Sequence, residues 1–88
     1  MKVVFRRSFV RDLRTIGDGK LREHVERIVA QVEQADALRD LPNVIAMQGH
    51  STAFRIRVGT YRIGLYRDGD TIEFVRFLHR RDVYRYFP

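Results

Sequence analysis

The sequence predicts an α+β fold in which two N-terminal helices pack on one face of an antiparallel sheet. Three observations support this prediction. They are an apolar strand pattern at the N-terminus, two segments with apolar residues at helical spacing, and a C-terminal half in which apolar and polar residues alternate around two glycine turns. The 88 residues suffice for one modest hydrophobic core, so we expect a single domain over residues 1–88.

The N-terminal half is expected to contain one strand and two helices. Residues 2–6, KVVFR, predict the first strand. Ser8 is expected to cap a helix that ends near Thr15, because apolar residues recur there every three or four positions. Asp18 is expected to cap a second helix, roughly residues 19–34, which repeats that spacing. The opposite, charged face of this helix is expected to be solvated.

The middle of the chain is expected to be irregular before the sheet resumes. Residues 36–41 predict a single helical turn, which Pro42 stops. Residues 44–47 predict a short strand. Two hairpins then cover about residues 53–78, and residues 79–88 are expected to form one helical turn and a tail.

The first hairpin is expected to place two arginines directly opposite each other. Gly59-Thr60 fits a two-residue turn that begins with glycine, and such a turn fixes the pairing of the flanking strands. Apolar residues then occupy one face of both strands, while Arg57 faces Arg62 on the other. Arg55 faces Gly64 on that same side. We term Arg55, Arg57 and Arg62 the arginine cluster, and the sheet surface that carries them the arginine face.

A second hairpin is predicted by Asp68-Gly69, which is a strong turn signal. Its register is expected to place Leu65 opposite Ile72 and to continue the arginine face along the last strand. The residues expected on that continuation are Glu73, Val75, Phe77 and His79. Glu73 is expected opposite the side-chain-free Gly64, within reach of Arg55, and the arginine face is expected to stay uncovered.

Two interpretations of the arginine face remain open. Like charges directly opposite each other destabilise a sheet, so folding alone does not favour Arg57 against Arg62. A bound phosphate would satisfy both guanidinium groups at once, which favours a polyanion-binding surface. The alternative is a solvated charged face that Glu73 partly neutralises.

The composition favours a nucleic-acid partner. The chain carries 17 basic and 11 acidic residues, a net charge of +6, and two of the basic residues are lysines. Arginine suits planar, bidentate contact with phosphate, although a GC-rich genome would produce the same bias. Residues 55–88 hold eight basic and four acidic residues interleaved with aromatic ones, so the excess charge lies mainly in this half.

Several other classes of protein are disfavoured. Cysteine is absent, so neither disulfides nor thiolate chemistry is expected. His24, His50 and His79 lack metal-ligand spacing, so no metal or cofactor is expected, and His24 is expected on a solvated helix surface. The N-terminus lacks the apolar stretch of a signal peptide, and no segment is long enough to span a bilayer. The cytoplasm is therefore the expected location, with no membrane partner.

Three stretches together carry a family resemblance. SFVRDL after the first strand, RIRVGTYRIGLY in the first hairpin and HRRDVY near the end occur in an order and spacing that resemble the RelE/ParE superfamily of bacterial toxins. The resemblance implies a β-α-α-β-β-β fold. For RelE-type members it implies an mRNA endonuclease that works in the ribosomal A site. It also implies a cognate antitoxin that silences the toxin, and operator DNA binding only through the toxin–antitoxin complex.

The resemblance also assigns site residues. The positions that match the catalytic set of RelE-type members are Arg57, Arg62, His79, Arg80 and Tyr84. Arg55 and Arg81 are expected to bind RNA, and Arg81 remains the alternative to Arg80 because the loop before it is shorter than in the family. Some members have lysine where this chain has Arg55 and Arg57.

The implied reaction needs no metal. The 2′-OH of the RNA attacks the adjacent phosphorus and leaves a 2′,3′-cyclic phosphate and a 5′-OH, which requires a base, an acid and cations around the phosphorane. Arginine stays protonated and suits the cationic role. His79 is expected to be the general acid, with a base role also open, unless it simply ends a strand. Tyr84 is expected to stack on a base or orient the 2′-OH, unless it packs the C-terminal tail.

Two functions compete with the endonuclease. ParE-type members share the fold but inhibit DNA gyrase and lack the full nuclease set. A small RNA-binding domain, or a degenerate toxin kept only as the partner of its antitoxin, would show no growth effect at all. The joint presence of the five matched catalytic positions favours the RelE type.

Overall fold

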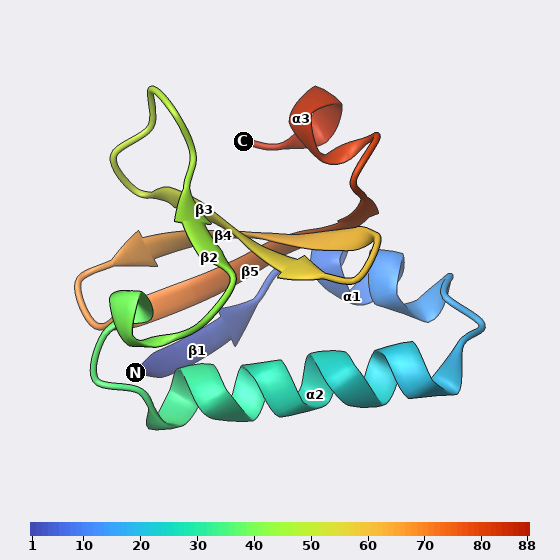
Figure 1. Cartoon of the computed structure of the whole chain (residues 1–88), viewed down its shortest axis with the longest axis horizontal. Helices are drawn as coiled ribbons and strands as arrows, with labels where there is room; N and C mark the ends of the chain where they lie inside the picture. Colours follow the sequence, from blue (N-terminus) through green and yellow to red (C-terminus); the bar gives the residue numbers. More distant parts are fainter.

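A computed structural model describes all 88 residues and confirms the α+β fold (Figure 1). The elements in chain order are β1 (Lys2–Phe5), α1 (Arg7–Arg14), α2 (Gly19–Gln34), the 3₁₀ turn η1 (Leu38–Asp40), β2 (Val44–Ala46), β3 (Ala53–Val58), β4 (Tyr61–Asp68), β5 (Thr71–His79) and α3 (Val83–Tyr86). Each element lies within a few residues of its predicted position. No helix combines the length and apolar composition that a membrane span requires.

The five strands form one mixed sheet with the order β1-β5-β4-β3-β2. The four later strands pair antiparallel, but β1 pairs parallel with β5, so the expectation of a purely antiparallel sheet was incomplete. The parallel pair arises because α1 and α2 follow β1 and carry the chain across the sheet. Figure 1 shows these two helices on one side of the sheet and α3 on the other.

The two N-terminal helices begin in different ways. The Asp18 carboxylate accepts hydrogen bonds from the backbone N–H groups of Lys20 (3.0 Å) and Leu21 (3.2 Å), so the predicted cap of α2 is confirmed. The predicted Ser8 cap of α1 was wrong. Arg6 is the N-cap residue of α1 without a side-chain cap, and the Ser8 hydroxyl donates instead to the carbonyl oxygen of Val75 on β5.

The main hydrophobic core fills the space between α1, α2 and the sheet. Its buried members are Phe9, Val25, Ile28, Val32, Leu38, Ile56, Val58, Ile63, Leu65, Ile72, Phe74 and Phe77. Apolar residues at helical spacing and at alternate strand positions therefore meet in one layer, as the sequence pattern predicts.

The β3–β4 hairpin has the predicted register. Arg57 lies directly opposite Arg62, and Arg55 lies opposite Gly64. Gly59, the first residue of the turn, has a φ of 61°, a left-handed conformation that glycine adopts without steric cost. The turn therefore sets the two strands of the arginine face as expected.

The predicted register of the β4–β5 hairpin was wrong. Asp68 pairs with Thr71, so the two turn residues are Gly69 and Asp70, and the glycine again comes first with a φ of 60°. Leu65 consequently lies opposite Phe74 rather than Ile72. Further along, the register shifts between Gly64 and Leu65, because Gly64 pairs with Arg76 and leaves Val75 as an extra residue on β5.

This bulge moves the end of β5 to the other face. Phe77 is buried in the main core, and His79 lies opposite Tyr61 on the helix-covered side, so neither continues the arginine face. Glu73 forms an ion pair with Arg6 (3.1 Å) and pairs along the sheet with Tyr66. The expected contact between Glu73 and Arg55 was therefore also wrong.

The arginine face is partly covered, contrary to expectation. The C-terminal segment folds back over it and forms a second small core with buried members Met47, Ala53, Val75, Val83 and Phe87. The Phe87 ring lies against the backbone of Gly64, where an added Cβ would come within 2.6 Å of the ring. Glycine at position 64 is thus required by the docking of the C-terminal segment.

Asp12 on α1 satisfies the free edge of β5 beyond the end of β1. Its buried carboxylate accepts a hydrogen bond from the backbone N–H of Phe77 (3.0 Å). It also accepts from the guanidinium group of Arg76, at 2.7 Å from Nε and 3.2 Å from Nη2. Arg76 in turn lies over the Tyr86 ring, 5.6 Å from its centroid. One carboxylate thereby links α1, the bulged part of β5 and α3.

Replacing Asp12 by alanine should lower the free energy of unfolding by about 3 kcal/mol, because it leaves the buried Phe77 N–H and the Arg76 guanidinium without a partner. Urea unfolding followed by circular dichroism measures this loss. The matched control is Asp36→Ala at an exposed position, which should change stability by less than about 0.5 kcal/mol. Equal small effects of both substitutions would contradict the linking role of Asp12.

Replacing Gly64 by alanine should cost about 2 kcal/mol, since the new methyl group would overlap the Phe87 ring. In a Phe87→Ala background the same substitution should cost much less, because the obstructing ring is gone. A double-mutant cycle in urea measures the coupling. Gly17→Ala serves as control, since a Cβ there meets nothing within 4 Å. An additive cycle would show that the two residues do not interact.

Candidate functional site

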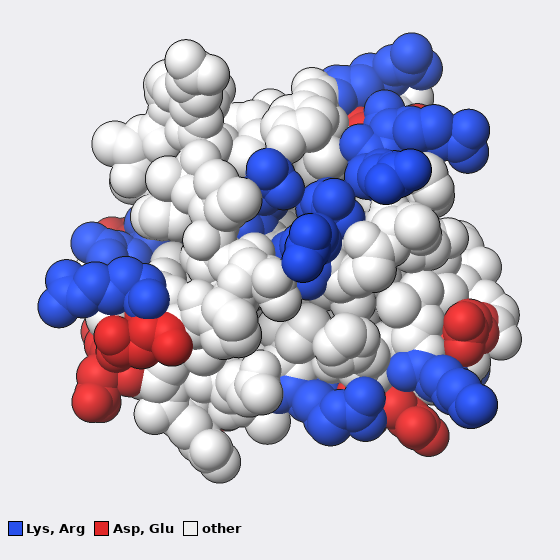
Figure 2. All heavy atoms as spheres, viewed as in Figure 1, with Lys and Arg blue, Asp and Glu red and all other residues white.

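The arginine cluster lies on the sheet face opposite α1 and α2. Arg55 and Arg57 project from β3, and Arg62 projects from β4 directly opposite Arg57. Figure 2 shows basic side chains gathered near the centre of this view, over the place where β3 and β4 lie in Figure 1. Strand alternation therefore concentrates positive charge on one surface.

No carboxylate neutralises this cluster. Arg62 donates from Nη1 to the carbonyl oxygens of Gly59 (2.9 Å) and Tyr61 (2.8 Å). The Arg57 guanidinium donates to the side-chain oxygen of Asn43 at 3.4 Å. The ion pairs of the molecule are formed by Arg6, Arg11 and Arg76, none of which belongs to the cluster. The charges are therefore available to an external anion.

The electrostatics of Arg62 reflect this lack of compensation. Partial burial is the largest cause that lowers the pKa of Arg62 below its ordinary value, and the positive charges of Arg55 and Arg57 lower it further. Arg80 adds a smaller effect of the same sign. A bound phosphate would offset these unfavourable interactions.

The loop after β5 brings Arg80 towards the cluster and leaves Arg81 outside it. The backbone N–H of Arg80 donates to the carbonyl oxygen of Thr60 at 2.8 Å, which ties this loop to the β3–β4 turn. Arg80 perturbs Arg62, whereas Arg81 is not among the groups that do. Both side chains are exposed. Of the two alternatives that the sequence left open, Arg80 is the one whose charge lowers the pKa of Arg62.

His79 lies apart from the arginine cluster. Its ring packs edge-on against Tyr61, with centroids 5.6 Å apart, on the helix-covered side of the sheet. Its Nδ1 accepts a hydrogen bond from the backbone N–H of Arg81 at 3.2 Å, so the neutral ring carries its proton on Nε2. The expectation that His79 stands beside Arg57 and Arg62 is not met, because the bulge in β5 reverses its side.

Tyr84 contacts the cluster from α3. The ring is 63% exposed, and the Arg55 guanidinium lies over it, 5.7 Å from its centroid. Its neighbours Val83 and Phe87 are buried in the second core and fix the position of α3. Tyr84 therefore does not pack the tail; the tail holds Tyr84 at the arginine face.

Asn43 is a site residue that the sequence pattern did not single out. It has a φ of 65°, the one non-glycine residue with a positive φ. Its carbonyl oxygen accepts from the backbone N–H of Arg57 at 3.1 Å, in addition to the side-chain contact. The sequence Leu-Pro-Asn carried a usable signal, since asparagine after proline is typical of a turn and tolerates the left-handed region.

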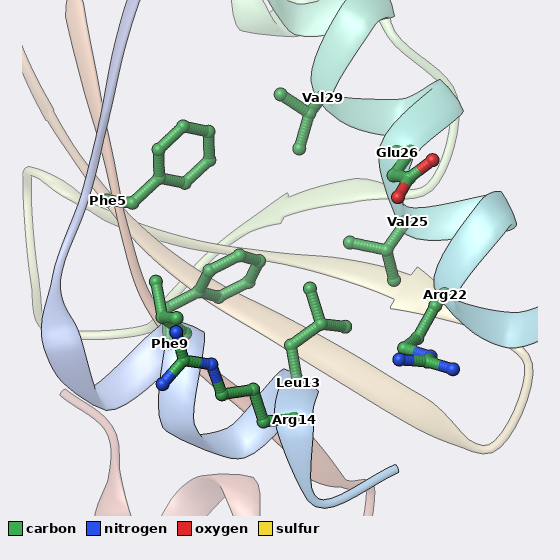
Figure 3. Close-up of a pocket in the computed structure, with 9 residues that line it drawn as sticks. Phe5, Phe9, Leu13, Arg14, Arg22, Val25, Glu26 and Val29 are labelled. Carbon is green, nitrogen blue, oxygen red and sulfur yellow. The ribbon is translucent and has the colours of Figure 1, made fainter. Parts of the chain in front are cut away.

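A separate apolar hollow of about 360 Å³ lies between β1, α1 and α2. Figure 3 shows Phe5 and Phe9 on one side of it and Val25 and Val29 on the other. Two basic side chains, Arg14 and Arg22, and one acidic one, Glu26, stand at its border, which is therefore mainly basic. Phe5 is 47% exposed, so this surface presents aromatic area that the fold itself does not bury.

The family and the relative that match this chain are both described as toxins. Residues 3–84 match the family described as the ParE toxin of type II toxin–antitoxin systems, parDE. The full chain is 42% identical to Toxin RelE3 of Methanocaldococcus jannaschii over the whole of both chains.

Solved structures agree with these relatives. The RelB–RelE antitoxin–toxin complex of Methanococcus jannaschii matches with a TM-score of 0.82 and 36% identity, covering 97% of this chain and 99% of that one. The archaeal RelE–RelB complex of Pyrococcus horikoshii matches with a TM-score of 0.75 at 17% identity, over 93% and 97% of the two chains, which supports the fold alone.

Replacing Arg62 by glutamine should leave the free protein as stable as before or about 0.5 kcal/mol more stable at low salt, because it removes the charge at the centre of the cluster. Added sodium chloride should then stabilise the variant less than the parent protein, since less repulsion remains to be screened. Thermal unfolding at roughly 20 mM and roughly 500 mM salt, where the Debye length is about 21 Å and about 4 Å, measures both effects.

The control is Arg27→Gln on the exposed face of α2, whose charge stands one helical turn from Glu23. This substitution should slightly lower stability. If Arg62→Gln lost more stability than the control, the Arg62 charge would stabilise the fold, and the prediction would be wrong.

Proposed function

The chain belongs to the RelE/ParE superfamily of toxins from type II toxin–antitoxin systems, and we propose that it is a RelE-type, ribosome-dependent mRNA endonuclease. The observation that carries the proposal is the uncompensated arginine cluster, with Arg80 and Tyr84 beside it. A cluster that weakens the fold through repulsion suits a protein whose partner is a polyanion. The 42% identity to a protein named Toxin RelE3 favours the same conclusion.

The cleavage is proposed to proceed by transfer within the RNA. The 2′-oxygen forms a bond to the adjacent phosphorus as its proton leaves to a base, and the bond from phosphorus to the 5′-oxygen breaks as that oxygen receives a proton. The products are a 2′,3′-cyclic phosphate and a 5′-OH end. Because the site is an open surface, positioning of the message by the ribosome would supply much of the rate enhancement.

The arginines are proposed to stabilise the phosphorane. Arg57 and Arg62 stand on adjacent strands directly opposite each other, a spacing that lets both guanidinium groups contact one phosphate. Arg80 adds a third charge, and Arg55 is proposed to bind the flanking RNA backbone. Because these groups stay protonated, they serve as cations and not as proton acceptors.

The proton-transfer group is proposed to be Tyr84 or His79, and the geometry favours Tyr84. Its ring touches Arg55 and it is among the groups that influence Arg62. His79 would act only through its free Nε2 from the margin of the sheet, on the side of Tyr61. The role of His79 as general acid therefore stays a prediction, which the cleavage rate of a His79 variant tests.

We propose that a cognate antitoxin binds and silences this toxin. The structural relatives are named as toxin–antitoxin complexes with RelB. The arginine face and the apolar hollow with its basic border both suit an acidic, amphipathic segment that folds on docking. Operator DNA would then be bound only through that complex.

A second candidate is favoured by the match to the ParE toxin model. In that case the chain would be a non-nuclease inhibitor of DNA gyrase, and the arginine face would contact protein. Purified gyrase and purified ribosomes, each incubated with the toxin, separate the two functions. Arrested supercoiling with intact message supports the ParE type.

The endonuclease proposal is tested by incubating the protein with a reporter mRNA on ribosomes from its source organism and mapping the cuts by primer extension. Arg62→Ala should lower the single-turnover cleavage rate about 10²–10³-fold, because one positioned transition-state donor is lost. Tyr84→Phe should reduce the rate more than His79→Ala if the tyrosine transfers the proton, and the reverse order would assign that role to His79.

Arg27→Ala, far from the arginine face on α2, is the matched control and should cleave at the parent rate. Message that stays intact with the parent protein on active ribosomes would refute the endonuclease proposal. Cleavage that survives in Arg62→Ala would instead refute the role of the cluster.

A further inference from the structure

A second, more polar hollow of about 170 Å³ lies beside Arg57, where α2 faces the loop before β2. Its lining residues are His24, Ile28, Gln31, Leu41, Pro42, Asn43, Val44, Ile56 and Arg57. They come from α2, from the segment between η1 and β2, and from β2 and β3. The tertiary structure thus assembles this hollow from parts of the chain that are distant in sequence.

The lining combines aliphatic side chains with hydrogen-bonding ones. Leu41, Pro42 and Ile28 supply apolar surface, whereas His24 and Gln31 present polar groups from positions two turns apart on α2. No carboxylate lines the hollow, and none of its residues takes part in an ion pair. An imidazole ring and a guanidinium plane beside aliphatic surface, with an amide at the edge, can stack on and hydrogen-bond an unstacked nucleobase.

Asn43 connects the hollow to the arginine cluster. Its left-handed backbone, with a φ of 65°, turns its carbonyl oxygen and its side-chain oxygen towards Arg57 at the same time. Asparagine tolerates this region better than other non-glycine residues, so Asn43 suits the turn that contacts Arg57. Arg57 therefore belongs both to the arginine face and to the lining of the hollow, and Asn43 holds it from both oxygens.

We propose that this hollow binds the base of a nucleotide adjacent to the phosphate held by Arg57 and Arg62, and that Gln31 and His24 determine which base is preferred. The inference rests on the proposed RNA cleavage function and adds its source of sequence preference. Arg57 belongs both to the arginine face and to the lining of the hollow. A nucleotide whose phosphate contacts Arg57 can therefore place its base in the hollow. The Gln31 amide and the His24 ring then read the edge of the base.

Binding can be tested without cleavage. The ¹⁵N-labelled protein is titrated with the nucleoside 3′-monophosphates and 5′-monophosphates of all four bases, and amide chemical shifts are followed by NMR. Shifts at His24, Gln31 and Asn43 should accompany those at Arg57, and affinity should differ about tenfold between the best and the worst base. Comparing the two series shows on which side of the phosphate the base lies.

Cleavage mapping on ribosomes provides the second measurement. At one fixed position next to the cut, Gln31→Ala and His24→Ala should reduce the ratio of cleavage rates between preferred and disfavoured bases about tenfold. The cleavage rate at sites with a disfavoured base should change less. The matched controls are Gln34→Ala and His50→Ala, which remove the same side chains from exposed positions outside the hollow. Alanine suits α2, so the variants should remain folded.

The outcomes separate this proposal from the function on which it rests. Base-dependent shifts at the hollow with no message cleavage support the hollow and refute the endonuclease. Shifts confined to the arginine cluster and equal for all bases refute the hollow. Cleavage whose base preference is the same in Gln31→Ala, His24→Ala and the controls also refutes the hollow and leaves the endonuclease standing.

Discussion

The buried Asp12 carboxylate is the interaction on which the arrangement of this small protein depends. β5 continues beyond the end of β1, so its outer edge would carry unpaired backbone groups against the core. Asp12 satisfies the Phe77 N–H at that edge and neutralises Arg76, which in turn lies over the Tyr86 ring. The same carboxylate therefore fixes α1 on one face of the sheet and steadies α3 on the other. The two hydrophobic cores hold the same layers together, and Asp12 adds a polar link between them.

The charges of the proposed functional surface are not compensated in this way. Asp12 pairs fully with its neighbours, whereas the arginine cluster has no acidic partner and lowers the pKa of Arg62 through burial and mutual repulsion. Stability given up at one surface is tolerable because the main core lies on the other face of the same strands. The contrast separates a charge that is paired within the fold from charges that have no acidic partner in it.

The β-bulge at Val75 decides which residues share a face. A single extra residue reverses the alternation beyond it, so Phe77 enters the core and His79 moves to the side of Tyr61. The spacing of Phe74 and Phe77 gave a faint hint, because both are aromatic although they stand three apart on a strand. Strict alternation assigned Phe77 and His79 to the arginine face, and that assignment failed for this local reason.

The sequence by itself determined the element order, the Asp18 cap, the first hairpin and the opposition of Arg57 and Arg62, since each depends on near neighbours and on turn chemistry. Only the tertiary structure decided the parallel partner of β1, the bulge, the return of the C-terminal segment over Gly64, and the hollow beside Arg57. These features join residues far apart in the chain, and their energies arise from packing that no local pattern encodes.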